Sequence, residues 1–284
     1  MSAPRVALML LVLLLGARTP ALAADVPGDG DQNPPAAPAD DIDLDPNPSQ
    51  PDFTLVNLPT TLRLPRMKSA FRVTHRFLRP LGQDDFGSLV EDMFGLDNGA
   101  IIGLEYRFGL MRGLQAGILR TSDRTIEFFG QYSVLNQRSG DAVGVGILAS
   151  IDGTNNFRDE YSPGLGVAIS RELGDHGAVY VEPVWVHNAN LTDNPGEDNS
   201  SFLVGLGLRL RVRPTVYLTG EYAPRAGYSP GVHQASFALE KRAGGHVFQL
   251  NLSNGFGNTM GQLARGGTSN EDWYLGFNIS RKFF

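Results

Sequence analysis

The feature of this sequence that most restricts its fold is an alternation of apolar with polar or small residues that recurs from residue 67 to the C-terminus. In the segment from Ala142 to Ile151, every second residue from Val143 onward is Val, Ile or Ala, and most residues between them are Gly or Ser. Side chains along a β-strand point to opposite faces in turn. Such a segment is therefore predicted to be a strand with one apolar and one polar face.

Twelve segments share this alternation, and turn residues separate them without a convincing core helix in between. An even number of antiparallel strands is typical of bacterial single-chain membrane barrels with both termini on one side. We therefore predict an all-β fold, a closed antiparallel membrane β-barrel with meander topology and about 12 strands. The predicted strands are 67–78, 98–109, 113–121, 124–134, 141–152, 159–171, 177–187, 200–211, 215–223, 232–242, 246–254 and 271–284.

The lengths of the connections support a barrel over a soluble β-sandwich. Short periplasmic turns and longer outer loops are typical of outer-membrane barrels. The apolar faces also carry aromatic residues near strand ends, which would form girdles at the headgroups; the alternative is that they are core aromatics of a soluble β domain. The predicted short connections are 110–112, 135–140, 172–176, 212–214 and 243–245, and the long ones on the opposite side are 79–97, 188–199 and 255–270.

The N-terminus predicts export. Arg5 precedes an apolar run from Val6 to Leu15, and Ala21-Leu22-Ala23 follows. A charged start, a short apolar run and a small-x-small site are typical of a secretory signal peptide, so residues 1–23 are predicted to be removed after Ala23. The apolar run is too short to cross a hydrocarbon core, which needs about 20 residues.

Residues 24–57 are predicted to be a disordered, Pro- and Asp-rich periplasmic leader, and residues 58–284 the barrel. Removing Arg5 and Arg18 from the 24 basic residues, and the eight Asp residues up to Asp52 from the 30 acidic ones, leaves 22 of each. The barrel is therefore neutral, and nothing supplies the basic surface that nucleic-acid binding requires. The absence of cysteine excludes disulfides and thiolate chemistry.

The C-terminal strand predicts a partner. Its apolar stripe runs from Trp273 to Phe283, Arg281 interrupts it, and the chain ends at Phe284. A terminal aromatic on an amphipathic last strand resembles the signal read by the barrel-assembly machinery, which we expect to bind here. Outer-membrane lipids are the other expected partner.

Several motifs resemble an uncharacterised bacterial outer-membrane β-barrel family, of the type called domain of unknown function 5777. The resemblance covers nearly everything after Leu58 and implies a barrel in the cell envelope, without catalytic residues. The motifs are Phe71 to Leu81 (FRVTHRFLRPL), Phe94 to Ala100, Gly113 to Gly117, and Arg120 to Thr125 followed by Glu127 to Tyr132.

Polar and charged residues of both signs fall on the faces predicted to point inward. They are able to line a narrow wet pore and set its selectivity, or to pair with one another and close the lumen. Inward glycines agree with either interpretation. The candidate pore-lining residues are Glu105, Arg107, Glu127, Gln131, Arg209, Arg211 and Glu221, and Arg72, Arg76, Glu182, Glu240, Gln249 and Asn251 share their phase.

The leading functional hypothesis is a narrow outer-membrane channel for passive passage of small solutes. The alternative is a closed structural or partner-binding barrel without transport. A third hypothesis is an interfacial lipid hydrolase, for which His233 with Ser236, or His187 with Ser200 and Ser201, are the nearest Ser–His combinations. We predict no enzyme activity, no catalytic residue, no metal site and no cofactor, since the five histidines fall on separate strands or turns.

One long connection contains a predicted short helix that would constrict the barrel mouth, lie on the membrane surface or pack on the rim of the barrel. Its apolar residues repeat at helical spacing. They are Phe86, Leu89, Val90, Met93 and Phe94.

Overall fold

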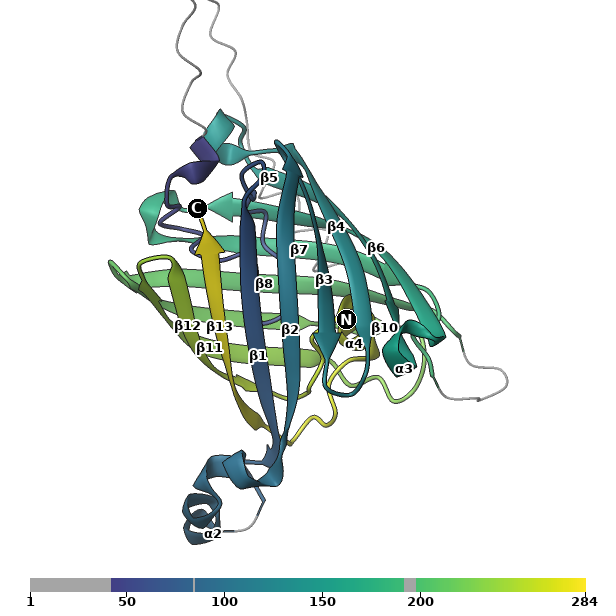
Figure 1. Ribbon diagram of the computed structural model, residues 1–284. Helices are drawn as coiled ribbons and strands as arrows, with labels where there is room; N and C mark the ends of the chain where they lie inside the picture. The colour runs from purple at the N-terminus through teal and green to yellow at the C-terminus, as the bar shows by residue number, and fades with distance from the viewer. Residues whose placement is uncertain (1–41, 84, 192–197) are drawn as a thin grey trace, which may run out of the picture.

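A computed structural model describes residues 42–83, 85–191 and 198–284, and shows a closed barrel of twelve long antiparallel strands (Figure 1). The wall strands are β1 (Ser69–Pro80), β2 (Ala100–Met111), β3 (Leu114–Thr121), β4 (Ile126–Leu135), β5 (Gly144–Gly153), β6 (Asp159–Glu172), β7 (Gly177–Val186), β8 (Ser201–Arg213), β9 (Val216–Ala223), β11 (Gln234–Ala243), β12 (His246–Ser253) and β13 (Tyr274–Phe283). A thirteenth strand, β10 (Arg225–Ala226), is short and pairs with β8 beyond the end of β9.

Pairing between the first and last long strands closes the barrel. Ser69 lies opposite Phe283, and the ladder continues through Val73 and Ile279 to Arg76 and Gly276. All other long strands pair with their neighbours in chain order. The predicted fold class is confirmed, and each observed strand begins and ends within three residues of its predicted position.

The barrel has two unlike ends. At the turn end, where β1 begins and β13 finishes, the connections are short and include the single helical turns η3 (Gln137–Ser139) and η4 (Gly174–His176). At the loop end lie α2 (Phe86–Glu91), η2 (Met93–Asn98), α3 (Thr154–Phe157) and α4 (Met260–Arg265). Both ends of the β-wall sequence thus lie at the turn end, as an even strand number requires.

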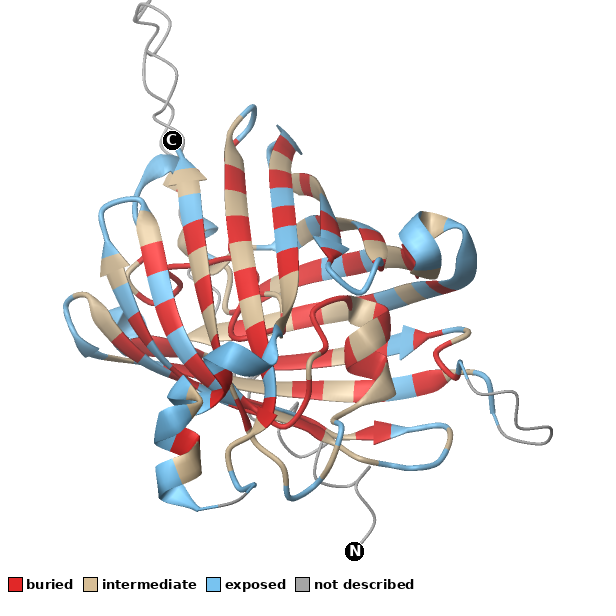
Figure 2. Ribbon diagram, turned by 60° about the horizontal axis from the view of Figure 1, so that its bottom comes forward, coloured by how far each residue is buried: buried red, intermediate tan, exposed pale blue. Residues whose placement is uncertain are grey.

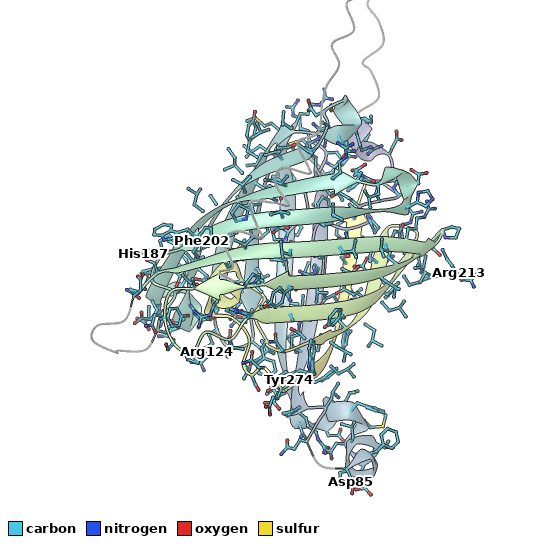
Figure 3. All side chains as sticks on the ribbon, turned by 180° about the vertical axis from the view of Figure 1, so that it is seen from behind. Asp85, Arg124, His187, Phe202, Arg213 and Tyr274 are labelled. Atoms are coloured by element: carbon cyan, nitrogen blue, oxygen red, sulfur yellow. The ribbon has the colours of Figure 1, made fainter. Side chains whose placement is uncertain are left out.

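Burial alternates along the wall, which Figure 2 shows as bands of colour on each strand. In β12, Phe248 and Leu250 are exposed, whereas Gln249 and Asn251 point into the lumen and are buried. The outside is therefore apolar and the inside polar, the reverse of a water-soluble protein and the arrangement of a lipid-facing wall. Figure 3 shows the same wall from behind, with Phe202 among the side chains that it labels. No helix within the described residues is long and apolar enough to cross a bilayer.

The lumen contains the segment that precedes β1. Residues 47–65, which we call the plug segment, run inside the ring of strands, and nearly all of them are buried (Figure 2). The short helix η1 (Ile42–Leu44) precedes the plug segment near the turn end. The prediction of a disordered leader up to residue 57 therefore differs from the structure for residues 42–57. The predicted signal peptide and residues 24–41 lie outside the described part of the chain.

The plug was missed because its residues have no strand period. Residues 53–64 nevertheless contain a density of large apolar residues that the Pro- and Asp-rich stretch before them lacks. Phe53, Leu55, Val56, Leu58 and Leu64 are each at most 3% exposed. Burial of these side chains in the lumen offsets the entropy of ordering the segment.

The helix predicted in the first long connection forms, but it does not enter the barrel mouth. Asp85 caps α2 by accepting a hydrogen bond from the Ser88 N–H, and the N–H groups of Ser88 and Gly87 lower the pKa of the Asp85 carboxyl. Leu89 is buried, whereas Phe86 and Met93 are exposed. The α2–η2 unit projects beyond the loop end (Figure 1), so it is not a constriction.

Closure between β1 and β13 predicts a specific cross-link. The chain has no cysteine, so a Val73→Cys, Ile279→Cys variant isolates one directly opposed pair. Oxidation should join the two ends of the wall and change the migration of the boiled protein on gels, because opposed antiparallel residues lie within disulfide reach. A Val73→Cys, Leu218→Cys control places the second cysteine on β9 and should not cross-link; equal cross-linking in both variants would argue against the closed ladder.

Candidate functional site

The plug segment folds back on itself inside the lumen. The Leu55 N–H donates to the Leu58 carbonyl at 2.8 Å, and the Thr60 N–H donates to the Phe53 carbonyl at 2.8 Å. Thr54 and Pro59 face each other as an isolated antiparallel bridge. The result is a narrow hairpin whose tip is the turn from residue 55 to residue 58.

A single carboxylate holds the tip of the hairpin. Glu221 on β9 accepts backbone N–H groups from Val56, Asn57 and Leu58, with N···Oε2 distances of 3.1, 2.9 and 3.1 Å. Its other oxygen accepts the Asn57 side-chain amide at 2.6 Å. Successive N–H groups that converge on one anion form a concave anion-binding turn. Here the anion belongs to the wall and the turn to the plug.

Wall side chains also bind the carbonyl groups of the plug. They come from strands all around the barrel, and each donates to a main-chain oxygen that would otherwise be buried without a partner. The pairs are Arg209 with Thr54 (2.6 Å), Gln249 with Leu55 (2.9 Å), Arg72 and Asn278 with Val56 (3.2 Å for Asn278), Gln131 with Thr60 (2.8 Å) and Gln115 with Leu62 (3.2 Å).

Other side chains of the wall contact side chains of the plug. Thr61 and Ser170 on β6 approach to 2.5 Å between hydroxyl oxygens, and Tyr180 on β7 donates to Gln50 at 3.2 Å. Ser280 on β13 donates to Asp52 at 2.5 Å. The plug is therefore fixed on several sides rather than resting against one strand.

Two glycines of β8 make room for the apolar side of the tip. A Cβ atom at Gly207 would lie 2.2 Å from the Leu55 Cδ1 atom, and one at Gly205 would lie 2.9 Å from both Leu58 methyl groups. Glycine permits this close approach because it has no side chain. The inward glycines, which the sequence could not interpret, therefore mark at this strand the seat of the plug.

Other charged residues of the lumen pair with one another. Arg209 contacts Glu240 at 2.9 Å with both side chains fully buried. Arg107 donates to Glu105 at 2.9 Å, and its guanidinium lies over the rings of Phe53 and Phe129. Both pairs lie beside the hairpin, where Arg209 also binds the Thr54 carbonyl of the plug.

A second segment closes the lumen from the loop end. The connection from residue 254 to residue 273 folds inward, and α4 begins at the Thr259 cap. Glu127 accepts the Met260 N–H at 2.8 Å, and Asp152 accepts the Thr259 hydroxyl at 2.5 Å. Leu263 of α4 belongs to the same buried apolar cluster as Leu55 and Leu58.

Only a small space separates the two closing segments. A cavity of ≈ 50 Å³ lies among Asn57, Arg72, Glu127 and Met260. That volume holds no more than a few water molecules. In the described structure, the plug segment and α4 thus occupy the lumen on either side of this cavity.

The seven candidate pore-lining residues occupy different positions. Glu221, Gln131 and Arg209 bind the plug backbone, Arg107 and Glu105 form a buried pair beside it, and Glu127 binds α4. Arg211 lies at the turn end of β8, opposite Tyr217, where its guanidinium donates to the Pro214 carbonyl at 3.1 Å. The site residues that sequence reasoning missed are those of the plug itself.

The Ser–His combinations do not assemble a triad. Ser236 lies in the lumen, bonded to Asn57 and Ser253. His233 accepts the Arg225 N–H. His187 and Ser200 approach to 3.2 Å at the loop end, but among the described residues no carboxylate or amide is bonded to the other ring nitrogen. The described part of the chain also contains no group of three His, Asp or Glu side chains placed to bind a metal ion.

Comparison with protein families identifies this arrangement. The model of a membrane bound beta barrel domain, DUF5777, matches residues 52–283. The chain belongs to this family. The match begins at Asp52, so the DUF5777 domain of this chain contains the plug hairpin as well as the wall. The family resemblance expected from the motifs is confirmed. No curated protein is significantly similar to the chain.

Solved structures share the barrel at low sequence identity. The NanC porin is 8% identical, with a TM-score of 0.51 over 75% of this chain and 100% of its own. Outer membrane phospholipase A from Escherichia coli is 14% identical, with a TM-score of 0.41 over 77% of this chain and 91% of its own. A mutant porin of Rh. blastica is 11% identical, with a TM-score of 0.35 over 66% of this chain and 56% of its own.

The central role of Glu221 predicts that Glu221→Gln loosens the plug. Hydrogen bonds to a charged group contribute about 1.5–3 kcal/mol, so the amide should raise the open population about 10- to 100-fold. The measurement is the rate of maleimide labelling at Thr60→Cys, a fully buried plug position. Glu127→Gln, which removes a lumen carboxylate that binds α4 and not the plug, should leave the rate unchanged. Equal rates in all three proteins would show that Glu221 does not hold the plug.

Proposed function

We propose that the protein is a gated channel of the bacterial outer membrane for small polar solutes, closed by its own plug segment. The observation that carries this proposal is that polar side chains of the wall bind the main chain of the plug. Glu221 binds three N–H groups of the tip, and Arg209 and Gln249 bind its carbonyls. Within the described residues, the plug joins the wall covalently only through residues 66–68 before β1.

The chemistry of this interface supports a plug that leaves. A hydrogen bond between protein groups replaces one to water, so each contributes only about 0.5–1.5 kcal/mol net, or about 1.5–3 kcal/mol where one group is charged. If the plug withdraws, water fills the lumen and solvates the same wall groups. An apolar wall could not form such hydrogen bonds with the water that enters. The polar lumen thus keeps the free energy of opening low compared with the number of hydrogen bonds that break.

The open lumen would suit small polar solutes without a strong preference for one sign of charge. Arg72, Arg76 and Arg209 face it together with Glu105, Glu221 and Glu240, all buried by the plug in the closed state. Mixed charges line a wet pore and favour polar solutes. The fold shared with the NanC porin is in keeping with passage through such a wall.

The outer-membrane location is part of the same proposal, with the turn end in the periplasm. Short turns on one side and long loops on the other support that orientation, as does the predicted signal peptide. The last strand ends at Phe283 and Phe284, at the turn end, where we propose that the barrel-assembly machinery engages it.

A reversible lock tests the gate. In an Asn57→Cys, Ser236→Cys variant, a disulfide would tie the tip to β11, where the native side chains are 3.2 Å apart. Planar-bilayer recordings of the oxidised protein should be silent, and reduction should restore conductance steps that grow with salt concentration, because only a free plug can leave the lumen.

The matched control carries its disulfide within the wall. Ser236→Cys with Ser253→Cys links β11 to β12, whose hydroxyl oxygens are 3.0 Å apart in the native protein. It should conduct equally in both redox states. If the reduced lock variant and the wild type both fold but give no conductance steps, the channel hypothesis is wrong. A closed partner-binding barrel then becomes the better proposal. The closure of the lumen by α4 from the loop end favours that alternative.

We also propose that the barrel is not a lipid hydrolase. Ser236 and His233 each have other partners, and the exposed His187–Ser200 pair lacks a bonded third group among the described residues. Phospholipid vesicles containing the protein should release no more fatty acid than vesicles containing the Ser200→Ala variant. Hydrolysis that this substitution abolishes would overturn the proposal.

A further inference from the structure

The outside of the barrel has a hollow where β9, β11, β12 and β13 lie side by side. It measures ≈ 400 Å³, and its surface is almost entirely apolar. Leu239, Phe248, Leu250 and Phe277 form its sides. Leu239 lies opposite Leu250, and Leu250 lies opposite Phe277, so one layer of the hollow spans three strands. The backbone of these strands forms the base of the hollow.

Three cationic or protonatable side chains border this hollow towards the turn end. His246 on β12 lies opposite Arg281 on β13, with 3.0 Å between the Arg281 Nη1 and His246 Nε2 atoms. Lys241 on β11 lies opposite Phe248, and its ammonium donates to the Thr215 hydroxyl at 2.8 Å. All three side chains lie on the outward face, in phase with the apolar residues of the hollow.

No acidic residue balances these groups on the outside. The acids of the four strands are Glu221 and Glu240, and both point into the lumen, where they are 3% and 0% exposed. Among the described residues, no carboxylate forms a salt bridge with Lys241, His246 or Arg281. Cationic side chains without a carboxylate partner, at one end of an apolar hollow on a wall that faces lipid, match an amphipathic anion.

We propose that an anionic phospholipid binds here, with its phosphate at Lys241, His246 and Arg281 and one acyl chain along the hollow. These three side chains lie at the end of the wall where the headgroup zone begins, since the strands give way to the turn at Gly244 and Gly245. A charged phosphate there meets two fixed cations and a histidine. Phe248, which stacks under His246 at 5.8 Å between ring centroids, joins the headgroup site to the chain site.

Charge and shape contribute separately to this site. Lys241 and Arg281 attract any anionic headgroup, and attraction of this kind is worth about fivefold in affinity for each cation near the surface. The hollow adds apolar contact for one chain. A lipid with the same chains and no net charge should therefore bind more weakly, and the site depends on neither the plug nor the lumen.

The test is native mass spectrometry of the full mature protein released from micelles that contain phosphatidylglycerol or phosphatidylcholine with identical chains. The wild type should retain one phosphatidylglycerol in preference to phosphatidylcholine. Lys241→Gln with Arg281→Gln should weaken retention of phosphatidylglycerol about 30-fold, because two cations are lost. Leu250→Trp, which fills the hollow, should weaken retention of both lipids.

The matched control removes two cations from the same end of the barrel but away from the hollow. Arg66→Gln with Arg112→Gln changes the net charge equally and should leave retention unchanged; both residues are exposed and lie next to β1 and β2. Folding of each variant is checked by its shift in gel migration on boiling. Equal loss in the control pair, equal retention of the two lipids, or a second copy of the barrel retained in place of lipid would each overturn the proposal.

Discussion

The structure depends on one constraint, that the main-chain hydrogen-bonding groups of the wall find their partners within the protein. In a bilayer no water is present to bond a free strand edge, so the sheet must close. Here β1 and β13 remove the edge by pairing from Ser69 and Phe283 inward. Closure fixes which residues face lipid and which face the lumen, because a strand that joins both neighbours cannot turn over without breaking two ladders.

The polar interior follows from that closure and creates a second requirement. A narrow barrel directs arginines, glutamates and amides to its axis, where they need partners or water. Some pair directly, as Arg209 does with Glu240. Others bind a hairpin of main chain, which offers donors to Glu221 and acceptors to Arg72 and Gln249. Main chain suits this role because it presents both kinds of group at close spacing, whatever its side chains.

The plug also fits against the wall because two wall residues that face it are glycines without side chains. Leu55 and Leu58 occupy space above Gly207 and Gly205 that any larger residue would fill. From there a single apolar cluster continues to Leu263 of α4, so the closing segments from the two ends meet inside the barrel. The wall is thus one closed sheet, and the two segments inserted into it are the parts that the proposed gate would require to move.

The sequence by itself determined the wall. A period of two is a local property that follows from strand geometry, so the twelve strands, their faces and the alternation of short and long connections could be predicted from residues close together in the chain. The inward direction of Glu105, Arg107, Glu127, Gln131, Arg209 and Glu221 followed from the same period.

Only the tertiary structure decided what fills the lumen. The contacts between Glu221 and residues 56–58 join parts of the chain more than 160 residues apart, and no local pattern encodes such a pairing. Strand period is set by the chain's own geometry, whereas the occupant of a cavity is set by whichever distant segment best satisfies its polar groups.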